Sequence, residues 1–173
     1  MTKMELHGDQ SSASLTREND APTLAVAETR VLFVAFKSDG AELALPANTV
    51  VQMESFTGAT PVPGALPYVK GIVQIRGRVV PVIDLRVRFG GPPTVITEMT
   101  RLVVGRHGER TVALLVDTAR EVVMLAPSSI KPAPRIVDGQ AAGFVRGIAQ
   151  TADRVLMILD FAKVIGEAEL DVE

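Results

Sequence analysis

The chain has 173 residues, of which 18 are basic and 20 acidic, so its formal net charge is −2 at pH 7. It has no cysteine, which excludes disulfides, thiolate metal sites and cysteine nucleophiles and indicates a reducing compartment. One tyrosine and no tryptophan leave little aromatic surface on which bases could stack, so we expect no nucleic acid among its partners.

Residues 1–28 mix small polar residues with scattered charges and show no sustained hydrophobic period, which predicts a disordered N-terminal tail. The tail has no continuous apolar stretch of the kind found in signal peptides or membrane anchors. Apolar runs elsewhere in the chain are far shorter than the roughly 20 residues that cross a bilayer. We therefore expect a soluble, cytoplasmic protein with no direct membrane insertion.

From Val31 onward, short runs of Val, Ile, Leu and Thr alternate with turn residues, which predicts an all-β domain over residues 29–166. Turn residues at Ser38-Asp39-Gly40 and at Arg76-Gly77 predict two tight reversals. The predicted strands cover residues 30–36, 42–45, 50–55, 69–75, 78–83, 100–106, 111–116, 119–125, 143–149 and 154–159.

Three further segments complete the expected organisation. Prolines between residues 126 and 134 predict a long surface connection, because proline cannot join a central ladder. Residues 84–89 and 160–165 are predicted short helices, each opened by an aspartate that caps the first free N–H groups. Residues 167–173 are predicted to form an acidic C-terminal tail.

The chain contains an internal repeat, because residues 68–90 align without a gap on residues 144–166. Both segments have the pattern of a strand, a turn, a second strand and a capped helix. This predicts two halves that are related by a pseudo-twofold axis, with a groove between them. The alternative is a chance likeness between two hairpins. Identical residues occupy the pairs Val69/Val145, Gly71/Gly147, Ile72/Ile148, Gln74/Gln150, Arg78/Arg154, Val79/Val155, Asp84/Asp160 and Gly90/Gly166.

Residues that could carry a reaction are few. His7 lies in the predicted tail and His107 in a predicted turn, so neither is placed for acid–base work. Asp84, Asp117 and Asp160 each end a strand, and helix capping accounts for two of them. No metal-ligand spacing and no phosphate-binding glycine loop occurs. The sequence therefore predicts no catalytic residue, no metal and no cofactor, and a protein that is not an enzyme.

A basic segment marks the first half of the repeat and suggests a charged docking face, although an ordinary solvated β surface is the alternative. Arg76 stands out because it projects from a tight turn and aligns with Ala152 in the second half. The hairpin tips thus differ in chemistry although their frameworks agree. The basic residues between residues 70 and 88 are Lys70, Arg76, Arg78, Arg86 and Arg88.

An ordered series of motifs over residues 31–165 resembles the CheW family. One such motif would be weak evidence, whereas the series as a whole is specific. Its members are Thr60-Pro61-Val62-Pro63-Gly64, Val69-Lys70-Gly71-Ile72, Arg76-Gly77, Pro81-Val82-Ile83-Asp84-Leu85-Arg86, Arg88-Phe89-Gly90, Thr100-Arg101-Leu102-Val103-Val104, Leu115-Val116-Asp117, Glu121-Val122-Val123, Val145-Arg146-Gly147-Ile148 and Ile158-Leu159-Asp160.

The resemblance implies a CheW-like fold of two five-stranded β-barrel subdomains. It also implies a chemotaxis scaffold in membrane-associated chemosensory arrays, which binds the regulatory domain of a CheA-type histidine kinase and the cytoplasmic tips of chemoreceptors. An apolar groove can accept a receptor helix while an arginine at its rim fixes the register. The alternatives are a module of a pathway with another output such as pilus motility, a fragment of a CheA-like or CheV-like protein, or a small-ligand-binding β-barrel.

Residue by residue, the resemblance makes Gly71 and Arg76 receptor-coupling positions and makes Val50 and Val51 part of a neighbouring contact strand. The family commonly has Glu where this chain has Gln52, and a glutamate two residues on faces the same side of the strand. The predicted partner-binding residues are Val50, Val51, Gln52, Glu54, Gly71, Arg76, Arg78 and Arg86.

Overall fold

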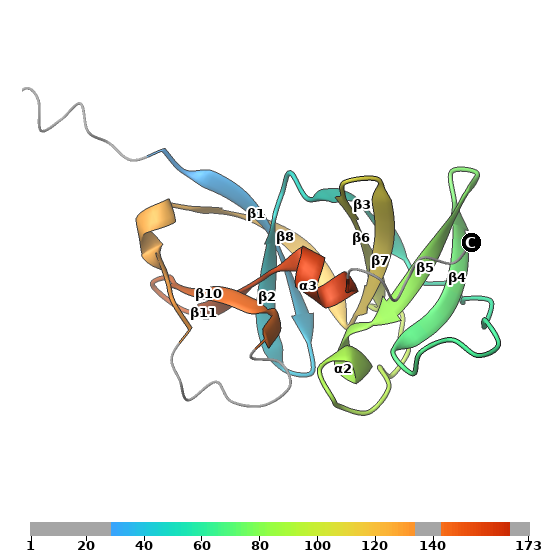
Figure 1. The fold of residues 1–173 in the computed structure, drawn as a ribbon. Coiled ribbons are helices and arrows are strands. Elements are labelled where there is room, and N and C mark those ends of the chain that lie inside the picture. Colours follow the sequence, from blue (N-terminus) through green and yellow to red (C-terminus); the bar gives the residue numbers. More distant parts are fainter. Residues whose placement is uncertain (1–28, 134–142, 167–173) are drawn as a thin grey trace, which may run out of the picture.

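The computed structural model describes residues 29–133 and 143–166, and the predicted tails at 1–28 and 167–173 lie outside them. Two β-sheets lie side by side, with two short helices near the middle of the molecule (Figure 1). The elements are β1 (Val31–Ser38), β2 (Ala41–Pro46), β3 (Val50–Ser55), β4 (Val69–Ile75), β5 (Arg78–Asp84), α2 (Leu85–Arg88), β6 (Arg101–His107), β7 (Arg110–Val116), β8 (Thr118–Leu125), a 3-10 turn (Pro127–Ser129), β9 (Ile130–Lys131), β10 (Val145–Gln150), β11 (Val155–Leu159) and α3 (Phe161–Ile165).

The predicted all-β architecture is confirmed, and each of the predicted strands is present. The first sheet has the strand order β8-β1-β2-β11-β10-β9 and the second β3-β6-β7-β5-β4. Two details differ from the prediction: the sheets are open and not closed barrels, and the first gains the two-residue strand β9 within the segment predicted as a surface connection. In the second sheet the free edge of β4 is met instead by Thr60, which pairs with Ile72.

The two repeated hairpins have the same backbone irregularity. The register shifts between Val69 and Gly71 in the pairing of β4 with β5, and between Val145 and Gly147 in the pairing of β10 with β11. A backbone hydrogen bond of 2.8 Å then closes each hairpin at the entry to its helix. A shared bulge is a specific feature of a strand pair, so the internal repeat is a structural repeat as well as a sequence one.

The symmetry extends beyond the hairpins, and it interleaves the two halves of the chain. β5 runs parallel to β7, and β11 runs parallel to β2 in the equivalent register. β3 pairs with β6, whereas its counterpart β8 pairs with β1. Each sheet is therefore built from strands of both halves, and neither half can complete a sheet alone.

One hydrophobic core joins the sheets. Phe36 and Leu43 of the first sheet pack in the same cluster as Leu114 of the second and Phe161 of α3. Full burial of such side chains stabilises the fold by about 1.5–3 kcal/mol each. Each sheet also has a smaller hydrophobic cluster of its own. Ile158 belongs to the cluster of the first sheet, and the second sheet has a separate cluster of buried side chains. The shared core holds the sheets as one unit.

The predicted reversals and helix starts are also confirmed. Arg76 (φ 50°) precedes Gly77 (φ 79°), and Asp39 (φ 52°) precedes Gly40 (φ 80°), so both hairpins have positive φ at their two turn residues, as in type I′ turns. Asp84 caps α2 through the N–H of Arg86, and the aspartate at the equivalent place caps α3. The β4–β5 hairpin, which carries the Arg76-Gly77 turn, lies at the end of the second sheet farthest from the first sheet (Figure 1).

Candidate functional site

Four of the predicted partner-binding residues lie together in one hollow. This hollow, of about 230 Å³, lies between β3 and the tip of the β4–β5 hairpin. We name it the three-arginine hollow, after Arg76, Arg78 and Arg106. The other residues that line it are Val51, Gln52, Ile75, Val80, Val104 and Thr111.

Edge strand β3 presents different chemistry on its two faces. Met53 (40% exposed) faces away from Gln52 and Glu54, whereas Val51 (54% exposed) lies at the register shift between Val50 and Gln52 and lines the three-arginine hollow with Gln52. On the other face, the amide of Gln52 donates a hydrogen bond to the carboxylate of Glu54, as expected for two side chains on the same side. Val50 is half-buried where β3 begins and packs against the shared core.

Glu54 lies outside the three-arginine hollow. It lines a larger neighbouring hollow of about 620 Å³ between β3 and β4, together with Thr60, Ile72 and Val79. Val79 is 65% exposed, so this part of the surface combines one acid with apolar side chains. Both hollows border β3 and are lined by Ile75, so they are neighbouring parts of one candidate contact surface.

Gly71 is buried and shapes the site through its backbone. Its φ of +150° lies in the region that favours glycine, and a Cβ atom there would lie 2.3 Å from the carbonyl oxygen of Thr60. The glycine thereby lets the segment around Thr60 pair with Ile72 and form one wall of the larger hollow. The position predicted to couple to receptors is therefore one that the structure uses to place β4.

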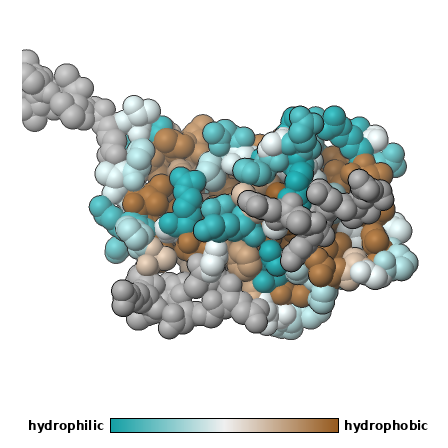
Figure 2. Space-filling model, in the orientation of Figure 1, coloured by the Kyte–Doolittle hydropathy of each residue, from teal (hydrophilic) through white to brown (hydrophobic). Residues whose placement is uncertain are grey.

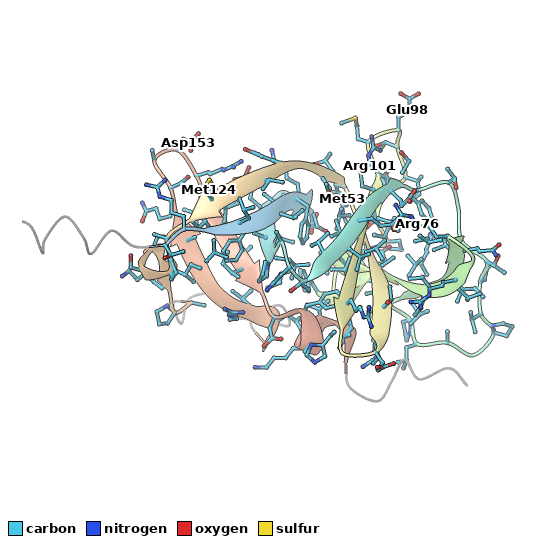
Figure 3. All side chains as sticks on the ribbon, turned by 90° about the horizontal axis from the view of Figure 1, so that it is seen from above. Met53, Arg76, Glu98, Arg101, Met124 and Asp153 are labelled. Atoms are coloured by element: carbon cyan, nitrogen blue, oxygen red, sulfur yellow. The ribbon has the colours of Figure 1, made fainter. Side chains whose placement is uncertain are left out.

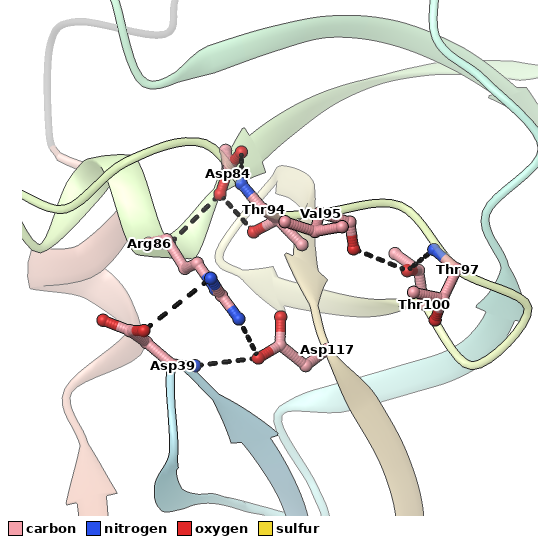
Figure 4. Close-up of polar contacts among 8 residues, drawn as sticks. All are labelled: Asp39, Asp84, Arg86, Thr94, Val95, Thr97, Thr100 and Asp117. Atoms are coloured by element: carbon pink, nitrogen blue, oxygen red, sulfur yellow. Dashed lines mark hydrogen bonds and ion pairs between the residues drawn. The ribbon is translucent and has the colours of Figure 1, made fainter.

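Arg86 lies apart from the hollow and is engaged within the fold (Figure 4). Its guanidinium donates a 2.6 Å hydrogen bond to Asp117 and lies 3.7 Å from the carboxylate of Asp39. The hydrogen bond to Asp117 is the chief reason that the pKa of Arg86 is raised above its usual value. Its side chain is only 18% exposed and is held by these two aspartates, so Arg86 is not part of the candidate contact surface.

Arg88 is likewise a structural residue. Its guanidinium donates to the carbonyl oxygens of Val164 (2.8 Å) and Lys163 (3.3 Å) at the end of α3, and lies 4.1 Å from the ring centre of Tyr68 and 4.8 Å from that of Phe144. Such contacts with ring faces are favourable for a cation. The basic segment therefore divides into two internal arginines and the three exposed residues Lys70, Arg76 and Arg78.

The first sheet has a corresponding hollow, in which the arginine is paired. Arg154 donates two hydrogen bonds of 2.8 Å to the carboxylate of Glu121 and lies 3.8 Å from that of Glu42. These three side chains line a hollow of about 340 Å³ with Lys37. The hydrogen bond from Arg154 is the main cause of a lowered pKa at Glu121.

Acid should release the pair of Glu121 with Arg154. The pKa of Glu121 lies below its usual 4.5, so its contribution to folding stability is fully present above pH 4.5 and is lost as the pH falls through the lowered value. We expect the urea midpoint of the wild type to exceed that of Glu121→Gln at pH 7 and the gap to narrow at about pH 3. An equal gap at both pH values would contradict this assignment.

Exposed apolar side chains are distributed over both sheets. Figure 2 shows hydrophobic residues on both halves of one face, separated by hydrophilic ones. Figure 3 labels Met53 on β3 and Met124 on the equivalent edge strand β8, and Met124 is 57% exposed. Arg76 and Asp153, at the tips of the two repeated hairpins, lie at opposite ends of the molecule (Figure 3). Both ends thus present an apolar edge strand, with different charges beside it.

Comparison with known proteins gives the family. The CheW-like domain model matches residues 32–169. The chain belongs to the CheW family. It is 33% identical over 132 residues to the chemotaxis protein CheW of Bacillus subtilis, covering 76% of this chain and 85% of that protein. It is also 26% identical over 151 residues to protein FrzA of Myxococcus xanthus, covering 86% and 94%.

The fold agrees with a solved CheW structure. The scaffolding protein TtCheW from Thermoanaerobacter tengcongensis superimposes with a TM-score of 0.75 at 25% identity, over 83% of this chain and 98% of that one. The resemblance to the CheW family seen in the sequence is thereby confirmed, and the chain is a chemotaxis coupling adaptor of that family. Among the described residues, no helix is long and apolar enough to cross a membrane, and no group of side chains is arranged to hold a metal ion.

The sequence prediction missed Arg106 and Thr111 of the three-arginine hollow. Both belong to the β6–β7 hairpin, which was interpreted only as structural. An alignment of β1 and β2 with β6 and β7 could have identified them, because these hairpins are also repeats of one another.

Proposed function

We propose that the chain couples the cytoplasmic tips of chemoreceptors to the regulatory domain of a CheA-type histidine kinase, within cytoplasmic arrays attached to membrane-anchored receptors. Residues 29–166 would serve as the coupling domain. The observation that carries this proposal is that exposed Val51 lies in one hollow with exposed Arg76, while exposed Met53 continues the apolar free edge of β3. Apolar contacts supply affinity and a rim cation supplies register when a helical partner docks.

The backbone at Arg76 supports a binding role. Its φ of 50° is uncommon for a residue with a side chain, and asparagine or glycine fits such a turn with less strain. An arginine kept at a strained turn position suggests that its side chain is used. The equivalent hairpin of the second half has Ala152 at this place.

The described residues also support a non-enzymatic role. They contain one histidine, His107, which is exposed at the end of β6. Asp84 and Asp160 are engaged as helix caps, and Asp117 holds Arg86. Acidic residues that stabilise the fold in this way are not available as a catalytic pair. The match to FrzA favours a pathway with a different output as the second candidate, in which the same coupling role would be kept.

Reversing the charge of Arg76 tests the proposed receptor contact. We expect Arg76→Glu to weaken binding of a receptor-tip fragment by about tenfold or more, because a rim cation that meets an acidic partner is replaced by a repelling anion. Binding is measured by isothermal titration, and kinase control by the rate of autophosphorylation in reconstituted arrays. The urea midpoint should stay close to that of the wild type, since Arg76 is exposed.

A matched variant shows whether the effect is local. Arg146 is an exposed arginine on β10 in the other sheet, so Arg146→Glu makes the same charge change away from the site. We expect it to leave receptor binding within about twofold of the wild type. If both variants bind and signal normally, Arg76 is not a receptor contact.

A further inference from the structure

The three-arginine hollow of the second sheet and the hollow of the first sheet that Glu121 and Arg154 line are repeats of one another. Their strands pair in the same order, with Val50 opposite Gly105 in one sheet and Ala119 opposite Phe36 in the other. The lining residues correspond in the pairs Val104/Ala35, Arg106/Lys37, Thr111/Glu42, Gln52/Glu121, Arg78/Arg154 and Val80/Leu156.

In the first sheet the hollow balances its own charges. The two cations face two carboxylates: Arg154 pairs with Glu121 and Glu42, and Lys37 lies 3.7 Å from Glu42. The guanidinium holds Glu121 through two parallel hydrogen bonds, which is the strongest geometry for this pair of groups. The first sheet thus provides an internal template: an arginine at the position of Arg154 binds a carboxylate at the position of Glu121.

In the second sheet both carboxylates are replaced by uncharged residues. Gln52 stands where Glu121 stands and Thr111 where Glu42 stands, while the arginine is kept as Arg78. The hairpin tip adds Arg76, and Arg106 takes the place of the lysine.

Within the described part of the chain, no carboxylate lies in ion-pair contact with the three arginines. Arg106 donates one hydrogen bond, to the carbonyl oxygen of Gly108 at 3.0 Å. The nearest acid along β3, Glu54, accepts a hydrogen bond from Gln52 and lines the neighbouring hollow. Three cations thus share one hollow whose counterpart supplies its own anions.

We propose that the three-arginine hollow is an acceptor site for one carboxylate side chain, Asp or Glu, of a partner protein. The partner's acid would take the place of Glu121 in the template and be held by Arg78, with Arg76 and Arg106 beside it. Apolar walls at Val51 and Val80 suit the methylene stem of such a side chain. The hollow of about 230 Å³ is smaller than the usual range for small-molecule pockets, which favours a single side chain.

The internal template also provides the decisive variant. The family commonly has Glu at the position of Gln52, so the acceptor site is proposed as a feature of this chain and not of the family. Here Gln52→Glu rebuilds the carboxylate of the first sheet inside the hollow, so Arg78 would be neutralised from within and the partner's acid displaced. This inference rests on the proposed function, and the partners used are a receptor-tip fragment and a kinase regulatory domain. We expect Gln52→Glu to raise the Kd for one of them at least tenfold, measured by isothermal titration.

Two control variants separate this effect from a general change of charge. Gln150→Glu adds the same charge at the repeat counterpart of Gln74, on exposed β10 of the other sheet, and should change the Kd less than threefold. Gln52→Leu adds no acid and should keep the wild-type Kd to within threefold. If Gln52→Glu binds both partners as tightly as the wild type, or Gln150→Glu weakens binding equally, the acceptor site is refuted while the coupling function stands.

A second measurement needs neither partner. Hexaglutamate peptide is titrated into the labelled protein, and the side-chain Nε–H resonances of the arginines are followed by NMR. Resonances of Arg78 and Arg76 should shift in the wild type and stay in place in Gln52→Glu, while that of Arg154 should stay in place in both. Equal shifts at Arg154, or shifts with a short RNA but none with hexaglutamate, would overturn the assignment. Failure of the wild type to bind either partner fragment would instead overturn the proposed function.

Discussion

Replacing Gly71 by alanine is expected to destabilise the protein by at least about 3 kcal/mol. The new Cβ would lie 2.3 Å from the carbonyl oxygen of Thr60, and the backbone at Gly71 would keep a φ of +150° that alanine rarely adopts. Because the obstructing atom belongs to the backbone, the segment around Thr60 must move away from β4. Urea unfolding, followed by circular dichroism, measures the change.

A second glycine serves as the control. Gly58 also has a positive φ, +118°, but no atom lies within 4 Å of the position of its Cβ. Gly58→Ala should therefore cost only the backbone strain, about 1–2 kcal/mol. Equal losses in the two variants would show that the close approach to Thr60 is unimportant. If Gly71→Ala loses stability as expected, any loss of receptor coupling in that variant follows from the displaced strand.

Asp84→Ala is expected to cost about 3–4 kcal/mol, although the residue looks like an ordinary helix cap. The Asp84 carboxylate is 2% exposed and accepts three hydrogen bonds: from the N–H of Arg86 (3.1 Å), and from the N–H (2.9 Å) and hydroxyl (2.6 Å) of Thr94 (Figure 4). Removing the acceptor leaves these donors unsatisfied in the interior. The free energy of unfolding in urea measures the loss.

The repeat supplies the matched comparison. Asp160 stands at the equivalent place before α3, is half-buried, and caps that helix through one hydrogen bond of 3.2 Å from the N–H of Lys163. Asp160→Ala should cost about 1 kcal/mol, which is typical for loss of an N-cap. If Asp84→Ala costs no more than Asp160→Ala, the bonds to Thr94 do not stabilise the fold.

Features that depend on neighbouring residues could be predicted from the sequence. Strand patterns and turn residues such as Arg76-Gly77 predicted the hairpins, and the aspartates predicted the starts of α2 and α3. The repeat indicated the two related halves. These features depend on backbone preferences and on alternation of apolar residues, which act over a few positions.

Features that depend on distant partners could not be predicted in this way. Arg86 and Arg88 looked as exposed as Arg76, because their internal partners, Asp117 and Val164, lie far along the chain. The closure of the barrels also depended on whether β3 and β4 would pair, and the pairing of Thr60 at the edge of β4 is not visible in any local pattern.

The interleaving of the two halves has a consequence for synthesis of the protein. β1 pairs with β8 and β2 pairs with β11, so the first sheet contains the first strands to be synthesised and is completed only by the last ones. While the chain leaves the ribosome, β1 and β2 can pair with each other, but their outer edges have no native partner yet. Contacts between residues so far apart in sequence form slowly. The second sheet has all of its strands once β7 has left the ribosome, whereas the first is completed only by β11, so a product truncated after β7 would contain the strands of one sheet and lack the partners of β1 and β2.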